Sequence, residues 1–355
     1  MYSRDVDFPS GDVVLAGTLT LPDDESRGCA VVLLPGSGHH DRDETLGHLK
    51  PLRTMAAHLA AHGIAAVRFD GRGVGSSGGT VAAVSFATKT ADALAARQML
   101  IDVGGFGAER VALVGHSEGG LVAAAVAAQC PTPVVMLGGP AMPIAELHHA
   151  MTRAQSLAQG ASDGQLVHER TMNEAVFRIL MSDTPVDQAR RSVEAVIARA
   201  LAHWPGIDRQ CADDIARTAK AMADTVLADD FRSLLQQDPA DILRRVRSPI
   251  LAMFAELDCQ VPVGPNLAAF EAATNGKSRA STCVLARHNH LFQVAVTGRI
   301  DEYPMLGSSP SPEALASLVD WLLVNCALPT GPCQREAAWR ELDRIATSAD
   351  SGPRQ

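Results

Sequence analysis

Short, uninterrupted apolar runs alternate with helical segments along most of this chain. The runs that predict strands occupy residues 29–38, 64–73, 110–115, 133–139, 248–258 and 281–286. The segments that predict helices occupy residues 49–63, 90–101, 120–129, 265–274 and 311–326. A strand that is apolar along its whole length is buried on both faces, which is typical of a parallel sheet. The pattern therefore predicts an α/β fold, with a mostly parallel sheet flanked by helices on both faces.

Local features refine several of these predicted elements. Residues 13–22 alternate apolar residues with small or polar ones, so we expect an antiparallel edge strand there. Gly63 is the expected stop of the first helix, because glycine tolerates the left-handed conformation that ends many helices. Ser311 is the expected N-cap of the last helix, with Pro312 at the first helical position.

The alternation is interrupted between residues 144 and 245. This stretch reads as helical and is rich in Ala, Arg, Asp and Gln, without an apolar run of the strand type. About a hundred residues are too many for a loop, so we expect an inserted helical unit. We therefore divide the chain into a first core part at 1–143, the helical insertion at 144–245, a second core part at 246–328 and a C-terminal extension at 329–355.

Two segments match the pattern Gly-x-Ser-x-Gly. Around Ser117, an apolar strand runs directly into the turn and an alanine-rich helix leaves it directly, which is the context of a nucleophile elbow. Around Ser77, the preceding strand ends several residues earlier and no obvious helix start follows. We therefore predict Ser117 as a nucleophile and assign Ser77 to a flexible turn.

A nucleophilic serine needs a base that removes its proton and an acid that orients the base. In this arrangement the chain order is serine, acid, histidine, with the acid after a later strand and the histidine after the last one. Asp258 is the preferred acid because it lies farther out on its loop than Glu256, which stays an alternative. His290 is preferred over His288 because the Leu-Phe pair that follows it would pack the loop onto the core.

The negative charge that develops on a carbonyl oxygen under attack needs N–H donors. The expected donors are the backbone N–H groups of Glu118, directly after the serine, and of Ser37, in the loop after the earlier buried strand. The helix that begins after Ser117 adds the positive end of its dipole at the same place.

Composition argues against several other functions. The formal net charge is −9 and no basic footprint is present, so we expect no nucleic-acid partner. The seven cysteines are scattered without a C-x-x-C pair, which argues against a disulfide framework and favours a reducing, cytoplasmic compartment. The histidines lack partners at metal-ligand spacing, and we expect no metal. We also expect no signal peptide and no membrane span, because no apolar stretch is long enough. The sequence leaves a homodimer open.

Several of these motifs together resemble the α/β-hydrolase-fold serine hydrolases, and among them the bacterial carboxylesterases of the serine-aminopeptidase-like set. The resemblance is carried by residues 35–44, 47–79, 115–120, 238–262 and 288–293. It covers most of residues 5–324 and is thin across the insertion. It implies an α/β-hydrolase fold with a helical cap over the site and a triad of Ser117, Asp258 and His290. It also implies that the chain hydrolyses short-chain carboxylic esters, a small-molecule substrate, without a cofactor.

Two features depart from the family pattern. His39 and His40 follow the Gly-Ser-Gly segment, where family members often have a proline and a small or polar residue. The insertion is also unusually rich in charge and alanine, and both departures fall where a substrate would be contacted. The charges at Asp41–Glu44 and at Arg72 lie near the rim of the predicted site, and we expect structural ion pairs there rather than binding of a substrate carboxylate.

The leading hypothesis is therefore a serine esterase. The same triad would also serve a peptidase, a thioesterase, a lactonase or an acyltransferase, because only the pocket distinguishes these enzymes. A binding protein without catalytic activity on the same scaffold is a third hypothesis. It is disfavoured because a serine, an acid and a histidine occur in the expected order and context.

Overall fold

The computed structural model describes residues 1–23, 28–102, 104–204, 212–307 and 309–326. Within these ranges, eight strands form one sheet in the order β1-β2-β4-β3-β5-β6-β7-β8. The strands are β1 (Tyr2–Ser10), β2 (Val13–Leu21), β3 (Ala30–Leu34), β4 (Ala65–Phe69), β5 (Val111–His116), β6 (Val134–Leu137), β7 (Ile250–Ala255) and β8 (Ala280–Leu285). β2 pairs antiparallel with β1 and β4, and the other pairings are parallel. The predicted mostly parallel sheet is confirmed.

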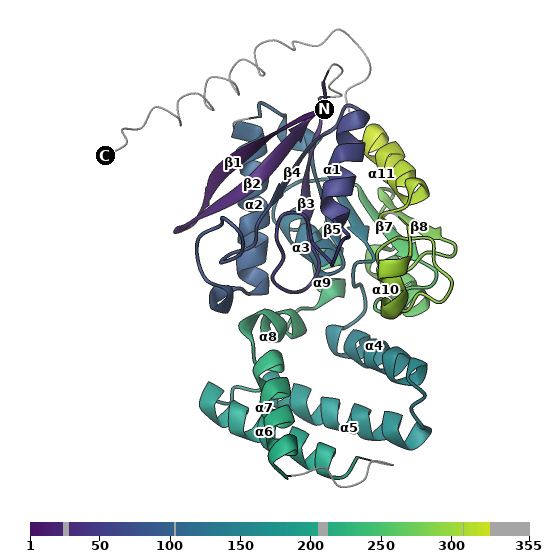
Figure 1. The fold of residues 1–355 in the computed structure, drawn as a ribbon. Coiled ribbons are helices and arrows are strands. Elements are labelled where there is room, and N and C mark those ends of the chain that lie inside the picture. Colours follow the sequence, from purple (N-terminus) through teal and green to yellow (C-terminus); the bar gives the residue numbers. More distant parts are fainter. Residues whose placement is uncertain (24–27, 103, 205–211, 308, 327–355) are drawn as a thin grey trace.

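Helices cover both faces of this sheet (Figure 1). They are α1 (Pro51–Ala61), α2 (Phe86–Asp102), α3 (Glu118–Ala127), α4 (Ile144–Ala158), α5 (Asp163–Leu180), α6 (Val186–Ala202), α7 (Ala212–Val226), α8 (Asp229–Leu235), α9 (Pro239–Arg245), α10 (Val263–Thr274) and α11 (Pro312–Asn325). Val31 and Leu33 of β3 share a core with α1 and α11. Val32 and Leu34 point the opposite way, into the core that α2, α3, α9 and α10 complete.

Two helix ends confirm their predicted caps. α1 ends at Ala61, and Gly63 adopts a φ of +81° two residues later. The hydroxyl of Ser311 accepts a hydrogen bond from the Ala314 N–H at 3.1 Å, and Pro312 stands at the start of α11. Glycine and serine therefore stand where the backbone leaves or enters the helix.

The edge of the sheet differs from the sequence prediction. The strand predicted at residues 13–22 forms β2, but it is not an edge strand, because β1 pairs with its outer side. β1 carries Arg4, Asp5 and Asp7 among its nine residues, so its apolar alternation is limited to Val6 and Phe8. Charged side chains are a common feature of edge strands, where they oppose pairing with another chain. The same charges hide such a strand from a search for apolar runs.

The helical insertion lies between β6 and β7, and its described residues contain α4 to α9. Figure 1 shows α4 to α8 grouped beyond one end of the sheet, whereas α9 packs against α3 and α10. Because α4 follows β6 after a short connection, this is the end at which the parallel strands terminate. It is therefore the edge of the sheet where β5 delivers Ser117.

The predicted C-terminal extension at 329–355 lies outside the described residues. Within the described part of the chain, no helix is both long enough and apolar enough to cross a membrane.

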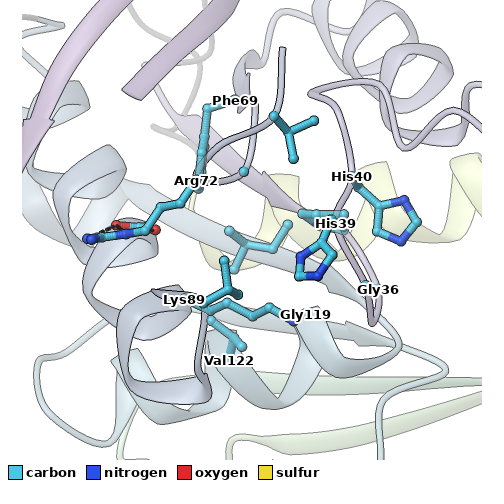
Figure 2. Close-up of a pocket in the computed structure, with 15 residues that line it drawn as sticks. Gly36, His39, His40, Phe69, Arg72, Lys89, Gly119 and Val122 are labelled. Carbon is cyan, nitrogen blue, oxygen red and sulfur yellow. Dashed lines mark hydrogen bonds and ion pairs between the residues drawn. The ribbon is translucent and has the colours of Figure 1, made fainter. Parts of the chain in front are cut away.

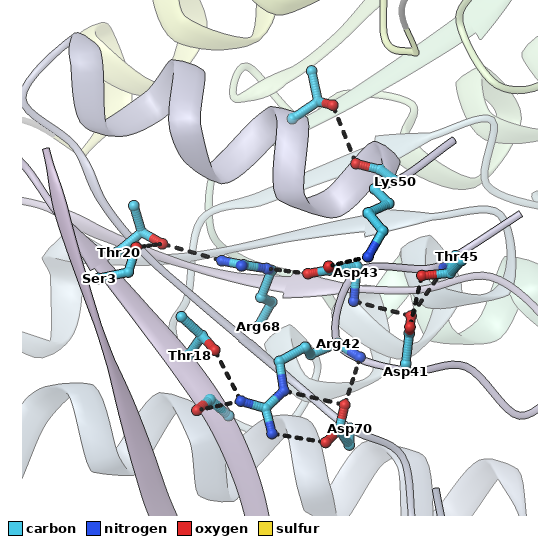
Figure 3. A network of polar contacts seen from close by, with 12 residues as sticks. Ser3, Thr18, Thr20, Asp41, Arg42, Asp43, Thr45, Lys50, Arg68 and Asp70 are labelled. Atoms are coloured by element: carbon cyan, nitrogen blue, oxygen red, sulfur yellow. Dashed lines mark hydrogen bonds and ion pairs between the residues drawn. The ribbon is translucent and has the colours of Figure 1, made fainter. Parts of the chain in front are cut away.

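Buried ion pairs tie the loop after β3 to the outer strands (Figure 3). The guanidinium of Arg42 lies 2.7 Å from a carboxylate oxygen of Asp70, at the end of β4. Arg68 of β4 reaches Asp43 in the same way at 2.8 Å. Burial, the largest single influence, would raise the pKa of the Asp70 carboxyl, but the contacts with Arg42 and the Ser76 N–H together hold that pKa below its ordinary value. These two ion pairs therefore fix the loop after β3 to β4.

The remaining predicted rim charges are also engaged within the protein. Arg72 pairs with Asp92 at 2.7 Å, and Asp41 accepts hydrogen bonds from Thr45. Glu44 contacts His116 beneath the sheet edge. The predicted ion pairs are confirmed for Arg42, Asp43 and Arg72, whereas Glu44 pairs with a histidine and Asp41 accepts hydrogen bonds where an ion pair was expected.

Ser77 lies in a turn, as predicted, but the description of that turn as flexible is wrong. Its side chain is buried. The hydroxyl donates to the Asp70 carbonyl at 2.7 Å and accepts from the Ala16 N–H at 2.9 Å, so it joins the end of β4 to β2. A small hydroxyl side chain satisfies two buried backbone groups here, which periodicity along the chain does not reveal.

We predict that Ser77→Ala destabilises the fold without changing the chemistry of the protein. The substitution leaves a buried N–H and a buried C=O without their partner, which costs about 1–3 kcal/mol. Urea denaturation measures this loss. The neighbouring Ser76→Ala is the matched control, because the Ser76 side chain is exposed. Equal midpoints for the two variants would contradict a structural role for the Ser77 hydroxyl.

Candidate active site

Ser117 stands at a strained junction between β5 and α3. Its φ is +52° and its ψ is −123°, a backbone conformation that L-residues rarely adopt. The Ser117 N–H donates to the Leu137 carbonyl of β6 at 2.8 Å, and its own carbonyl accepts from Gly120 at 2.9 Å. The first bond holds the turn against β6, and the second closes the turn at the start of α3. The side chain is only partly buried, in a segment whose neighbours are buried.

The glycines around Ser117 are required by close backbone contacts. A Cβ atom on Gly115 would lie 2.0 Å from the Gly119 carbonyl oxygen. A Cβ atom on Gly119 would lie 2.4 Å from the carbonyl oxygen of Pro35. No real Cβ contact is this short, so the strand and the helix meet only because both positions lack a side chain. This explains the spacing of the Gly-x-Ser-x-Gly segment in physical terms.

Asp258 and His290 lie together in the interior, at the ends of β7 and β8. The Nδ1 atom of His290 is 2.7 Å from Oδ2 of Asp258, and both side chains are buried. The other oxygen, Oδ1, accepts the backbone N–H groups of Gln260 and Val261 at 2.8 Å each. A carboxylate only accepts hydrogen bonds, so Nδ1 carries the proton and Nε2 keeps a lone pair. That tautomer is the one that a general base requires.

The two alternative residues have other partners. The ring of His288 contacts the Ala286 carbonyl through Nδ1 at 2.8 Å and the Ser311 hydroxyl through Nε2 at 2.7 Å. Glu256 is exposed and accepts the Arg287 N–H. Both ring nitrogens of His288 are therefore engaged elsewhere, and Asp258 rather than the exposed Glu256 pairs with His290.

Ser117 meets the Asp258–His290 pair through its immediate neighbours. His116 precedes it, and the centroid of the His116 ring lies 4.7 Å from that of His290. Gly138 follows the strand to which Ser117 is bonded, and a Cβ atom there would lie 3.3 Å from both Asp258 Oδ2 and His290 Nδ1. The ends of β5, β6, β7 and β8 thus bring the three predicted residues to one place.

The loop after β3 also reaches this place. The N–H of Gly36 donates to Oε1 of Glu44 at 2.7 Å, so it is engaged, and Ser37 offers the next N–H along the loop. Glu118 is the first residue of α3, where the backbone N–H has no intrahelical acceptor. A Cβ atom on Gly36 would lie 3.3 Å from the Ser117 Cβ, so this loop passes directly beside the elbow.

Comparison with known families decides the classification. The sequence model described as serine aminopeptidase, S33, matches residues 40–292 of this chain. The chain belongs to the S33 serine aminopeptidase family. The match spans β4 to β8 and includes Ser117, Asp258 and His290, and the sheet with its flanking helices is an α/β-hydrolase fold. The family and the fold that the resemblance implied are confirmed.

Individual proteins similar to this chain include hydrolases with different names. Esterase EstD of Thermotoga maritima is 26% identical over 249 residues, which are 70% of this chain and 50% of that protein. The chain thus spans about half the length of this curated relative. The α/β hydrolase GrgF of Penicillium is 17% identical with a TM-score of 0.55, over 92% of this chain and 100% of that one. The Pyrococcus furiosus esterase is 15% identical with a TM-score of 0.54, over 92% of each.

Two buried polar contacts beside the S33 site were not predicted from the sequence. Glu44 lies 2.8 Å from the Nδ1 atom of His116. Lys89 of α2 lies 2.9 Å from a carboxylate oxygen of Glu118 and 2.6 Å from one of Asp230 in α8. Burial raises the pKa of the Glu118 carboxyl above its ordinary value, although Lys89 opposes the shift. The partners stand far apart in the sequence, so no local pattern joins them.

A pocket lies beside the elbow (Figure 2). Gly36 and Gly119 form part of its wall, together with apolar side chains that include Phe69, Val84 and Val122. Ser117 and His290 themselves are not among its lining residues. Its volume is about 60 Å³, counted as the space open to the centre of a water-sized sphere, which is several times the roughly 10–15 Å³ that one water needs on that measure.

Polar side chains also line this pocket. Figure 2 shows His39 and Lys89 at the pocket, whereas Arg72 turns toward its ion-pair partner. His39 and His40 are the residues that depart from the family pattern, and both line the pocket. In the described residues, no group of three or more His, Cys, Asp or Glu side chains could hold a metal ion.

We predict that Gly138→Ala lowers turnover by about 10- to 100-fold, because small displacements of catalytic groups are costly. The new Cβ would press on Asp258 and His290 at 3.3 Å, in a residue whose φ is +57°. Gly11→Ala is the matched control, because Gly11 has a φ of +64° and open space around its Cβ position. Both variants carry about 1–2 kcal/mol of backbone strain. Hydrolysis of p-nitrophenyl acetate and urea denaturation separate the two effects, and equal turnover in both variants would contradict this account.

Proposed function

We propose that this chain hydrolyses carboxylic esters of small molecules through an acyl-enzyme formed on Ser117. The observation that carries the proposal is the buried 2.7 Å contact between Asp258 and His290, which leaves the Nε2 atom of His290 as an acceptor beside the strained turn at Ser117. A serine on such a turn is exposed to a substrate at the carboxyl edge of the sheet. The esterase names among the relatives point in the same direction.

The proposed reaction begins when Ser117 Oγ attacks the ester carbonyl. His290 Nε2 takes the hydroxyl proton, and Asp258 stabilises the imidazolium that forms. The N–H groups of Ser37 and Glu118 hold the oxyanion. The bond to the alcohol then breaks, and the alcohol leaves with the proton that His290 returns. Water attacks the acyl-enzyme by the same steps, which releases the carboxylic acid and restores Ser117.

Burial strengthens the proposed roles of Asp258 and His290. The Asp258 carboxylate accepts three hydrogen bonds, two from backbone N–H groups and one from His290. Such a fixed carboxylate needs no reorganisation when the imidazole becomes charged. The low dielectric of the interior further increases the attraction between the two groups.

The size of the substrate is inferred from the pocket and the insertion. The pocket beside Gly36 and Gly119 has a volume of about 60 Å³, which favours a short acyl or alkoxy group. We infer that the helices at residues 144–245 act as a cap, because they stand beyond the edge of the sheet where Ser117 lies (Figure 1). A cap restricts access and excludes water from the intermediate.

Amide hydrolysis is the second candidate function. The family is named for aminopeptidases, and a proline iminopeptidase of Mycobacterium smegmatis shares the fold, with 15% identity and a TM-score of 0.53 over 91% of this chain and 99% of that one. A thioesterase, a lactonase or an acyltransferase would use the same groups. A binding protein without activity is disfavoured by the satisfied geometry of Asp258 and His290.

We infer a cytoplasmic location and no requirement for a cofactor. The chemistry proposed for Ser117, His290 and Asp258 balances without any further group. The thiols of Cys130, Cys259, Cys283 and Cys326 suit a reducing compartment. We propose a small-molecule substrate, with neither nucleic acid nor membrane as a partner, and a homodimer stays open.

We predict that Ser117→Ala lowers the hydrolysis of p-nitrophenyl acetate by at least about a thousandfold, because a triad acts as a unit. A fluorophosphonate probe should label the wild-type chain and leave this variant unlabelled. Ser77→Ala is the matched control, because it removes the serine of the other Gly-x-Ser-x-Gly segment and should keep both labelling and turnover. Activity that survives in Ser117→Ala would exclude the mechanism.

We further predict that esters are turned over faster than amides. Parallel assays with p-nitrophenyl acetate and longer p-nitrophenyl esters, aminoacyl p-nitroanilides and acyl thioesters measure the preference directly. A short pocket predicts that kcat/KM falls as the acyl chain lengthens. A higher kcat/KM for an aminoacyl anilide than for any ester would favour the aminopeptidase alternative instead.

A further inference from the structure

A buried pair of ionisable groups, Glu44 and His116, lies beneath the proposed site and has no role in the reaction described above. The two side chains are 1% and 7% exposed. The Nδ1 atom of His116 is 2.8 Å from Oε1 of Glu44. The residues are 72 positions apart in the chain, and they join the loop after β3 to the end of β5.

The partners of His116 fix its protonation. Nδ1 faces the Glu44 carboxylate, and Nε2 lies 3.0 Å from the backbone carbonyl oxygen of His290. The His290 carbonyl only accepts hydrogen bonds, the ionised Glu44 carboxylate does likewise, and a neutral imidazole has only one N–H to give. Two such contacts therefore require the doubly protonated imidazolium. His116 is then a buried cation that donates from both sides of its ring.

Each end of this pair holds a part of the proposed site. Oε1 of Glu44 also accepts the Gly36 N–H at 2.7 Å, directly before Ser37, whose N–H is a proposed oxyanion donor. At the other end, His116 holds the carbonyl of His290, the proposed base, and the two rings lie 4.7 Å apart. Ser117 follows His116 in the chain. One ion pair thus touches the loops of the oxyanion donor, the nucleophile and the base.

The backbone at Glu44 supports a specific role for this carboxylate. Glu44 has a φ of +54°, which is strained for a residue with a side chain. A strained residue persists at a buried position only when hydrogen bonds and packing hold it there, and such residues often serve a function. Glycine would relieve the strain here, but it would remove the carboxylate that reaches Gly36 and His116.

We propose that Glu44 and His116 are positioning residues. They form a permanently charged pair that holds the Ser37 amide and His290 in the arrangement required for attack by Ser117. This inference rests on the proposed function. Neither residue touches the substrate, so both act through the groups that they hold.

The electrostatics agree with this geometry. Burial is the largest single influence and opposes the charged form of His116, but Glu44, the His290 carbonyl and Asp258 together outweigh it, and the pKa of His116 lies above its ordinary value. Burial would likewise raise the pKa of Glu44, but His116 and the Gly36 N–H lower it below its ordinary value. The other ionisable groups near the pair are Asp258 and His290, which face His116, and His40, which lies near Glu44.

The test compares Glu44→Gln and His116→Gln with a matched control. Asp43→Asn serves as the control, because Asp43 is a neighbouring buried acid whose partners, Arg68 and Lys50, lie away from the site. We expect each of the first two variants to lower kcat for p-nitrophenyl acetate by about 10- to 100-fold with little change in KM. The double variant should lose no more than about the larger single loss, because the pair acts as a unit. Asp43→Asn should lose stability and keep its kcat.

A second measurement reads the protonation of His116 directly. In ¹⁵N-histidine-labelled protein, long-range ¹H–¹⁵N spectra distinguish one from two protonated ring nitrogens, and loss of the signal in His116→Gln assigns it. We expect two protonated nitrogens in the wild type at pH 8 and one in Glu44→Gln. This readout does not depend on any hydrolytic activity, and it stands on the wild type alone if a variant fails to fold.

The outcomes separate this inference from the proposed function. A folded Glu44→Gln variant with wild-type kcat would overturn the positioning role, and a singly protonated His116 in the wild type at pH 8 would overturn the charged pair. A wild type that hydrolyses no p-nitrophenyl acetate, aminoacyl anilide or thioester, yet shows a doubly protonated His116, would overturn the proposed function while supporting the charged pair.

Discussion

The left-handed backbone at Ser117 is the constraint from which the rest of the site follows. A residue in that conformation carries strain of about 1–3 kcal/mol, and it persists only where its surroundings leave no alternative. The surroundings here are β5, all of whose residues are buried, and α3, whose ten residues are buried as well. The backbones of Gly115 and Gly119 touch, so neither element can move to relax the turn. The position of one hydroxyl is thereby set by the central layer of the fold.

The loops around this turn are fixed by a common device. In each case a buried carboxylate accepts hydrogen bonds from backbone N–H groups of its own loop. The same carboxylate also binds a histidine ring that comes from another segment of the chain. Asp258 does this with Val261 and His290, and Glu44 does it with Gly36 and His116. Buried loops need such acceptors, because their N–H groups have no strand or helix partner and no access to water. The same atoms that satisfy the backbone therefore orient the two histidine rings.

The sequence predicts the parts of this arrangement that depend on local order. Apolar runs predict β3 to β7, whose residues are all buried, because burial on both faces leaves a mark on every residue of a strand. β8 lies at the edge of the sheet and its run is weaker, and helical spacing predicts α1, α2, α3, α10 and α11. Ser117 is distinguished from Ser77 because its strand and helix adjoin it without a gap. β1 was missed because its charges mask its alternation.

Contacts between distant segments could not be predicted in the same way. Glu44 and His116 are ordinary residues in their local sequences, and only the pairing of β3 with β5 brings their loops together. Gly138 looks like any glycine after a strand, yet its missing side chain leaves the space that Asp258 and His290 fill. Local sequence patterns therefore identify the residues of the candidate site. The residues that hold them in place come together only through the order of the strands in the sheet.

A charged cluster at the start of α2 is one of the contacts that join the insertion to the core. Lys89 of α2 lies between Glu118, next to the elbow, and Asp230 of α8, and the Phe86 N–H donates to the Ser233 hydroxyl of α8 at 2.8 Å. The single ammonium group of Lys89 is shared between the two carboxylates, so each is only partly neutralised. If α8 moved away with Asp230, Glu118 would remain as the partner of Lys89. The elbow itself depends on backbone contacts rather than on this cluster. The backbone conformation at Ser117 therefore does not require the contact that Lys89 makes with the insertion.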